Sequence, residues 1–304
     1  MYNRITMLHE IQVVANAKVN IGLYVSPKRN DGFHDIDSIF TLAPISDDLT
    51  VLLALGENEC TVQCSFVFDG GEKEFLLPEN NTIVLTYNAF CKLTGFQKSV
   101  QVIIRKKIPA GGGLGGGSSD AASFLFALER LSGIVLTTEE RWKIAEKVGS
   151  DVFFFLYCLY NNEKTAFVSG RGEFVKGIKS RTDLYILIVC PFVHSSTKEA
   201  YDAVDRRLEK IDVGKRKTEK ELVDMYNKPI SEWKFFNDFT PVMTEKYNLI
   251  AKAISDVKES GALFADMSGS GSSVFGVFDN EEALMVSYNK LRTVWTCYAQ
   301  LSPI

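Results

Sequence analysis

The sequence predicts an α+β protein that folds into two domains. The chain has 304 residues, whereas one domain usually takes about 100–200 residues. Short strand patterns fill the first hundred residues and lead into a glycine-rich segment and a helix, and the second half orders its strands and helices differently. A loop-like stretch at residues 169–172 separates the halves, so we expect domains at 1–168 and 169–304.

Strand patterns dominate the first domain. Four of them cover Gln12–Ala15, Ile21–Val25, Leu49–Leu55 and Thr61–Phe68, and a fifth strand ends near Arg105. Beyond the glycines, apolar side chains recur every three or four residues in Asp120–Leu131, which predicts an amphipathic helix. A second helix is expected to begin at Thr138, and the apolar run Val152–Tyr160 is expected in the core.

The second half predicts a ferredoxin-like domain. Its elements are a buried strand at Tyr185–Cys190, helices marked by Tyr201 to Ile211 and by Tyr247 to Val257, two strands joined at residues 269–272, of which the second is Ser273–Phe278, a helix at Glu281–Leu291 and a strand at Val294–Gln300. The polar, lysine-rich residues 212–232 are interpreted as an inserted helix or loop. Without that insertion, the order fits the split βαβ arrangement.

The composition is that of a globular protein that acts on small molecules. Hydrophobic residues make up 46% and charged residues 24%, which excludes a disordered chain, a collagen-like repeat and a disulfide-dense miniprotein. The 34 basic and 38 acidic residues give a net charge of −4, so the basic excess of a non-specific nucleic-acid binder is missing. The six cysteines form no C-x-x-C pair and the three histidines are scattered, which favours reduced thiols and disfavours a zinc site.

The same sequence lacks the signals of export or membrane insertion. Its longest apolar run has nine residues, whereas a spanning helix needs about 20. Charges interrupt the apolar residues at the start of the chain, unlike in a signal peptide. We therefore expect a cytoplasmic protein with no membrane and no nucleic-acid partner, as a monomer or weak homodimer.

The segment between residues 109 and 119 carries most of the functional information. Six glycines occupy the seven positions 111–117, interrupted only by Leu114, between a predicted strand and a predicted helix. Glycine permits positive φ and a close approach of the backbone to a ligand. Backbone N–H groups beside a helix N-terminus attract anions, and Ser118 or Ser119 can cap that helix. We therefore expect a phosphate-binding loop suited to a triphosphate, with both hydroxyls near phosphate or its Mg²⁺.

Three other interpretations of these glycines are less consistent with the sequence. A Walker loop ends in G-K-[ST], whereas Ser118 and Ser119 follow Gly117 here. A Rossmann loop requires a parallel strand after the helix, and residues 136–138 do not predict one. A flexible linker does not usually lie tightly between a strand and an amphipathic helix.

Three segments together resemble the GHMP kinases. Residues 109–122, P-A-G-G-G-L-G-G-G-S-S-D-A-A, resemble the family's second motif, and residues 267–276, M-S-G-S-G-S-S-V-F-G, resemble its third. Residues 17–23, A-K-V-N-I-G-L, followed by K-R-N-D-G-F-H at 28–34, are similar to the opening of the branch that acts on 4-diphosphocytidyl-2-C-methyl-D-erythritol. Gly149–Val152 and Asn237–Phe239 also fit, so the resemblance covers nearly the whole chain.

The resemblance implies the two-domain GHMP kinase fold and an ATP-dependent reaction. The N-terminal domain would bind ATP and contain a left-handed βαβ unit, and the C-terminal domain would serve the substrate, which binds between the two. The implied reaction phosphorylates the C2 hydroxyl of 4-diphosphocytidyl-2-C-methyl-D-erythritol in the non-mevalonate isoprenoid pathway. Another GHMP activity, of the homoserine or mevalonate kinase type, and a non-catalytic nucleotide-binding protein stay open as alternatives.

The resemblance also implies roles for individual residues. Asp151 would be the catalytic aspartate and Lys18 the lysine beside the substrate hydroxyl, although Phe153 stands where the family usually has proline. ATP would contact Pro109, Ala110, Gly111, Gly112, Gly113, Leu114, Gly115, Gly116, Gly117, Ser118 and Ser119, with Ser119 reaching ATP-bound Mg²⁺. The substrate contacts would be Asn20, Phe33, His34, Thr197, Tyr201, Gly269 and Ser270, in which Phe33 and Tyr201 enclose the cytosine and His34 binds its edge.

Overall fold

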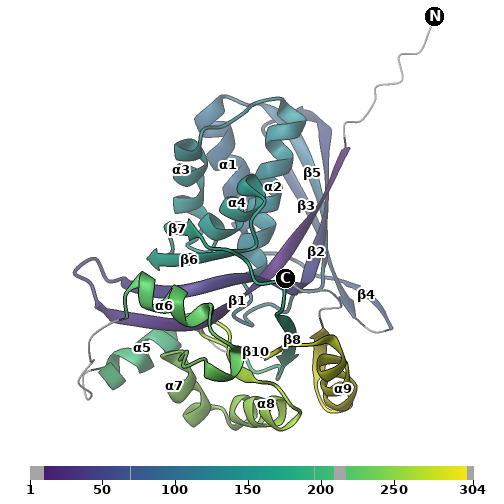
Figure 1. Ribbon diagram of the computed structural model, residues 1–304. Helices are drawn as coiled ribbons and strands as arrows, with labels where there is room; N and C mark the ends of the chain where they lie inside the picture. Colours follow the sequence, from purple (N-terminus) through teal and green to yellow (C-terminus); the bar gives the residue numbers. More distant parts are fainter. Residues whose placement is uncertain (1–9, 69, 195, 209–216, 300–304) are drawn as a thin grey trace, which may run out of the picture. The chain divides into compact units, whose positions relative to one another are not determined.

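The computed structural model describes residues 10–68, 70–194, 196–208 and 217–299 (Figure 1). The chain divides into two compact units, each built from several segments. The first unit takes residues 1–15, 46–108 and 116–159, and the second takes 16–45, 109–115 and 160–304. Neither unit begins or ends at residue 168, and the division into family domains at 1–168 and 169–304 stays a prediction.

The first unit combines a sheet with four helices. Its strands are the second part of β2 (His34–Glu57), β3 (Cys60–Phe68), β4 (Gly71–Glu74) and β5 (Lys98–Lys106), in the order β4-β3-β5-β2. Its helices are α1 (Thr82–Thr94), α2 (Gly116–Ser132), α3 (Thr138–Val148) and α4 (Val152–Asn161). Figure 1 shows the helices gathered beside the strands, and α1 packs on α2 and α3.

Helix α1 connects β3 and β5, which pair in parallel. This arrangement is a βαβ unit, as the resemblance implies. That its crossover is left-handed stays a prediction. The apolar run from Val152 forms α4, with residues 152–156 buried, so its place in the core is confirmed.

The second unit begins with a long hairpin. The first part of β2 pairs with β1 (Glu10–Lys28) and with β6 (Thr165–Gly170), which pairs with β7 (Phe174–Gly177). The rest of this unit comprises β8 (Tyr185–Cys190), α5 (Thr197–Leu208), α6 (Glu219–Tyr226), the 3₁₀ helix η1 (Ile230–Glu232), α7 (Phe239–Lys246), α8 (Asn248–Glu259), β9 (Phe264–Met267), β10 (Val274–Phe278), α9 (Glu281–Leu291) and β11 (Thr296–Ala299).

The ferredoxin-like prediction is confirmed within this unit. The four strands β8 to β11 form one antiparallel sheet in the order β11-β8-β10-β9, against which α8 and α9 pack. The predicted insertion includes α6 and η1, whereas residues 209–216 and the predicted helical position Ile211 lie outside the described residues. None of the described helices combines the length and the apolar character that crossing a membrane requires.

One predicted detail is wrong: neither Ser118 nor Ser119 caps α2, because the helix already begins at Gly116. Gly116 packs closely against the end of β5, where a Cβ atom would lie 2.9 Å from Ile108 Cγ2. Helix α2 thus includes the last two glycines of the run, and both serines lie in its first turn.

Candidate active site

The three motifs of the predicted site meet at Gly113 in the second unit. The Lys18 ammonium donates to the Gly113 carbonyl at 2.9 Å, and the Ser268 hydroxyl donates to the same oxygen at 2.9 Å. A Cβ atom on Gly113 would lie only 2.0 Å from the Ser268 carbonyl oxygen, and its φ of +74° is one that side chains disfavour. Glycine at this position therefore permits the loop and the third motif to touch.

Two backbone hydrogen bonds also connect the glycine loop to its neighbours. The Ser273 N–H donates to the Gly112 carbonyl at 3.0 Å, and the Lys18 N–H donates to the Leu114 carbonyl at 3.0 Å. The glycine loop is thus hydrogen-bonded on one side to β1 and on the other to the turn before β10. The loop therefore lies against the turn that carries Gly269 and Ser270, whose contact with the substrate stays a prediction.

Lys18 is buried on β1, with 3% of its surface exposed. Its ammonium donates to Asn20 Oδ1 at 2.6 Å and lies 4.9 Å from the centre of the Phe40 ring. The Asn20 amide in turn donates to Ser38 Oγ at 3.3 Å, and that hydroxyl donates to the Gly22 carbonyl at 2.5 Å. Strand alternation places Lys18 and Asn20 on one side, as predicted, and Asn20 holds the lysine. The role of Asn20 as a substrate contact stays a prediction.

Asn237 explains part of the third motif's shape. Its buried amide donates to the carbonyls of Met267 at 2.8 Å and Gly269 at 2.9 Å, and its side-chain oxygen accepts from the Phe239 N–H at 2.9 Å. The neighbouring Asp238 accepts from the Val25 N–H at 2.7 Å. The sequence singled out this pair but predicted no chemistry for it. The pair joins β1 to the turn that carries Gly269.

The first unit contains the beginning of α2 and the predicted catalytic aspartate. Asp151 lies in the turn before α4, where the Val152 N–H donates to the Gly149 carbonyl at 3.1 Å. A Cβ atom on Gly149 would lie 3.6 Å from Ser118 Oγ, so this hydroxyl faces the turn. Phe153 is buried in α4 and packs edge-on against Trp142 at 5.5 Å.

A buried ion network holds the segments that flank the glycine loop. The Lys106 ammonium, at the end of β5, contacts Asp47 at 2.5 Å and Asp120 of α2 at 2.6 Å. Asp47 also accepts from the Ile108 N–H at 2.9 Å. Burial raises the pKa of Asp120, whereas the two carboxylates raise the pKa of Lys106 against the effect of its own burial. The sequence pattern did not predict this network, although Lys106 and Asp120 lie at the two ends of the loop segment.

The predicted pyrimidine-binding residues gather around α5. The His34 ring stands edge-on to Tyr201 at 4.8 Å, and Tyr201 stands edge-on to Phe239 at 4.9 Å. His34 Nε2 lies 3.1 Å from Asp205 Oδ1, whereas His34 Nδ1 is buried without a hydrogen-bond partner among the described residues. Burial lowers the pKa of His34 and outweighs the opposite effect of Asp205, and Lys28 lowers it further, so the neutral ring predominates at pH 7.

Other predicted contacts lie near this group. The hydroxyls of Thr197 and Ser270 are 3.2 Å apart. Phe33 lies at the tip of the β1–β2 hairpin with 49% of its surface exposed. Asp205 was not predicted, although it lies four residues after Tyr201 and therefore on the same helical face.

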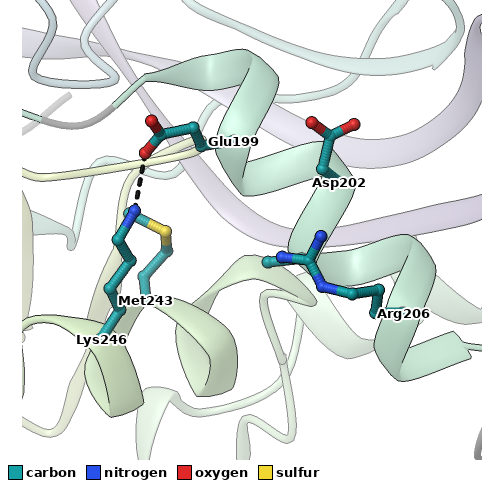
Figure 2. A pocket seen from close by; sticks show the side chains of 6 residues that line it. Glu199, Asp202, Arg206, Met243 and Lys246 are labelled. Carbon is teal, nitrogen blue, oxygen red and sulfur yellow. Dashed lines mark hydrogen bonds and ion pairs between the residues drawn. The ribbon is translucent and has the colours of Figure 1, made fainter.

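A separate hollow of about 280 Å³ lies on another side of α5. It is lined by Glu199, Asp202, Ala203, Arg206, Met243 and Lys246 (Figure 2). The Lys246 ammonium closes part of it through an ion pair of 2.6 Å with Glu199. At 100° per residue, these α5 positions point away from Tyr201, so the hollow is separate from the predicted pyrimidine-binding residues.

Comparison with known proteins identifies the family. A model of the GHMP kinases N terminal domain matches residues 81–158, and one of the GHMP kinases C terminal matches residues 228–295. The 4-diphosphocytidyl-2-C-methyl-D-erythritol kinase of Treponema pallidum is 34% identical over 295 residues, which cover 95% of this chain and 97% of that protein. The protein of the same name from Thermoanaerobacter pseudethanolicus is 35% identical over 290 residues, covering 95% and 94%.

Solved structures agree with this comparison. A crystal structure of 4-(cytidine 5'-diphospho)-2C-methyl-D-erythritol kinase has a TM-score of 0.73 and 25% identity, and covers 95% of this chain and 98% of that one. Homoserine kinase from Cytophaga hutchinsonii has a TM-score of 0.66 with 17% identity, covering 100% and 98%, which shows a shared fold. The chain belongs to the GHMP kinase family and, within it, to the 4-diphosphocytidyl-2-C-methyl-D-erythritol kinases.

Proposed function

We propose that this chain transfers the γ-phosphoryl group of ATP to the C2 hydroxyl of 4-diphosphocytidyl-2-C-methyl-D-erythritol, giving the 2-phosphate and ADP for the non-mevalonate isoprenoid pathway. The meeting of Lys18, Gly113 and Ser268 in one hydrogen-bonded cluster carries the proposal. It joins the opening segment, the glycine loop and the third motif, which are widely separated in the sequence. Relatives whose names state this activity support it over 95% of the chain.

The glycine loop is proposed to hold the phosphates of ATP. The loop runs from Pro109 into the first turn of α2, whose unpaired N–H groups form an anion site. A side chain at Gly113 or Gly116 would clash with Ser268 or Ile108, so both positions require glycine. This cradle suits a triphosphate.

Mg²⁺ fits the same arrangement. In kinase sites this ion is usually held by phosphate oxygens, water and only one or two protein oxygens, and it would neutralise charge on the phosphates. Ser118 faces the turn before Asp151, whereas Ser119 is buried in α2 with 1% of its surface exposed. The assignment of Ser119 as a ligand of the metal stays a prediction, and the Ser118 hydroxyl in the same turn is the alternative ligand.

Asp151 is proposed as the group that receives the substrate's proton. As the C2 oxygen bonds to the γ-phosphorus, the bond between that phosphorus and the β–γ bridging oxygen breaks, and ADP leaves with the electron pair. The hydroxyl proton passes to the Asp151 carboxylate, which contributes typically about 10²–10⁴-fold to such a reaction. Whether the proton moves early or late does not change this balance.

Lys18 is proposed to stabilise the negative charge that develops during transfer. Its ammonium is fixed by Asn20 and by the Gly113 carbonyl, so little reorganisation is needed when the charge appears. His34 is proposed to bind the edge of the cytosine, with Phe33 and Tyr201 on its faces. Binding of this remote group positions the reacting hydroxyl. We propose a cytoplasmic enzyme, as a monomer or weak homodimer.

The product of the reaction tests the proposal. Purified protein with ATP, Mg²⁺ and the cytidylyl substrate should release ADP and form a product whose new phosphorus signal couples to the C2 position by NMR. Asp151→Asn, which keeps the shape of the side chain, should lower kcat about 10²–10⁴-fold while ATP binding by calorimetry persists. A phosphate on another carbon, or wild-type turnover in Asp151→Asn, would contradict the assignment.

A further inference from the structure

An arginine that the reaction does not use covers one face of Phe33. The guanidinium carbon of Arg171 lies 3.7 Å from the centre of the Phe33 ring. Such stacked contacts are attractive because the ring face carries negative charge density. Phe33 is nevertheless 49% exposed. Because Arg171 occupies one face, the exposed surface of the ring lies at its edges and its other face.

The turn between β6 and β7 directs Arg171 toward this ring. Its N–H donates to the Glu173 carboxylate at 2.5 Å. The preceding Gly170 has φ of +69°, and a Cβ atom there would lie 2.6 Å from both Glu173 and Phe174. The turn therefore requires glycine at 170 and fixes where the arginine begins. The Arg171 Nε atom is buried without a hydrogen-bond partner among the described residues, so no hydrogen bond from this atom competes with the stack on Phe33.

Phe33 is held from the other end by its own hairpin. Its N–H donates to Asp31 Oδ1 at 3.1 Å, and its carbonyl accepts from the Arg29 N–H at 2.7 Å. The Arg29 guanidinium bonds to both Asp31 and Asp35, which closes the tip. The backbone is thus fixed, and the ring's orientation depends on what it stacks against.

We propose that Arg171 is a positioning residue for pyrimidine recognition: it stacks on one face of Phe33 and leaves the opposite face as the platform for the base. The inference rests on the proposed function for the identity of the base and extends it to a residue outside the family motifs. Arg171 acts through Phe33 and does not touch the substrate. Its removal should therefore change pyrimidine binding only while the Phe33 ring is present.

A double-mutant cycle tests this dependence. CMP serves as the probe, because its binding by calorimetry needs no turnover and reports on the base site even if the proposed reaction were wrong. Arg171→Met, which keeps the aliphatic stem, should weaken CMP binding about 3–10-fold, in keeping with a partly desolvated cation–π contact. Phe33→Leu should weaken it more, and the double variant should bind no worse than Phe33→Leu.

Two further variants control for folding. Arg171→Lys restores a cation over the ring and should recover most of the CMP affinity. Arg130→Met removes a comparable stack, in which the guanidinium carbon lies 3.4 Å from the Phe126 ring centre, and should leave CMP binding unchanged. In steady state, Arg171→Met should raise KM for the cytidylyl substrate with little change in kcat or in KM for ATP.

The opposite results would overturn the inference. Unchanged CMP binding in Arg171→Met would remove its positioning role. Additive losses in the double variant would mean that the arginine contacts the ligand directly. Equal losses in Arg130→Met would indicate a general effect of removing surface arginines.

Discussion

His34 shows how one side chain can combine burial with a recognition role. Only 3% of its side chain is exposed, and Asp205 from α5, Lys28 from β1 and Asp35 from β2 supply the charges around it, with the Tyr201 ring against it. Burial and Lys28 lower its pKa below the ordinary 6.5, and the two carboxylates only partly offset this. A neutral imidazole keeps one nitrogen as an acceptor, which a cytosine amino group can use.

We predict that His34→Ala raises KM for the cytidylyl substrate about 5–100-fold, because an unpaired buried polar group costs about 1–3 kcal/mol. KM for ATP should change little, since the glycine loop does not contain this residue. The measurement is a kinetic matrix in which each substrate is varied at saturation of the other. Equal increases in both constants would indicate misfolding, and an increase for ATP alone would mean that His34 serves the nucleotide donor.

The same side chain predicts a pH dependence. Burial lowers the pKa of His34 below the ordinary 6.5, so the neutral form predominates at pH 7 and the ring gains a proton at lower pH. Protonation removes the acceptor nitrogen, so KM for the cytidylyl substrate should rise in wild type as the pH falls from 7 to 5. His34→Ala should lack this rise. Parallel profiles for the two proteins would assign the titration to another group.

At the scale of elements, the glycine loop depends on contacts with partners distant in sequence. Gly113 contacts Ser268, whose turn is fastened by Asn237, and Lys106 holds the segments on either side of the loop. Lys18 of β1 also donates to the Gly113 carbonyl, so partners from β1 and from the β9–β10 turn meet at this residue. A phosphate loop without these supports would be too mobile to position a reacting group.

We predict that Gly113→Ala raises KM for ATP at least about tenfold, because the new Cβ atom would meet the Ser268 carbonyl at 2.0 Å and the φ of +74° would be strained. Gly133→Ala is the matched control. Gly133 has a nearly equal φ of +73° but nothing within 4 Å of a Cβ atom. It should lose a similar amount of stability to strain and keep its KM for ATP. An equal KM for ATP in the two variants would contradict a role of the glycine loop in ATP binding.

At the scale of the whole molecule, the sequence predicted the elements whose patterns are local. Tyr185–Cys190 and Glu281–Leu291 have the predicted bounds, because a continuous apolar run and a 3.6-residue period are sufficient signals. The strands at 12–15 and 21–25 instead form a single strand, β1, and α1 was not predicted. The Lys18–Asn20 region is polar on one face but fully buried, so its pattern interrupts the apolar signal of a continuous strand.

The candidate site divides in the same way. Motif residues such as Gly113 and Ser270 could be named from sequence because they lie in recognisable runs. Arg171, Asp205 and the Lys106 network could not, since each depends on a partner far along the chain. Asn237 was noticed but had no derivable role until its two carbonyl acceptors were known. Contacts between distant segments carry this part of the site, and periodicity does not encode them.

The most direct test of the central claim compares alcohols as acceptors of the ATP phosphoryl group. A coupled assay of ADP release should give kcat/KM for 4-diphosphocytidyl-2-C-methyl-D-erythritol, mevalonate and homoserine under identical conditions. The account predicts activity with the cytidylyl substrate that exceeds the other two by at least about 10³-fold, because a site built for hydrogen bonds rejects molecules that lack them. A higher kcat/KM for mevalonate or homoserine, or no ADP release with any of the three, would contradict it.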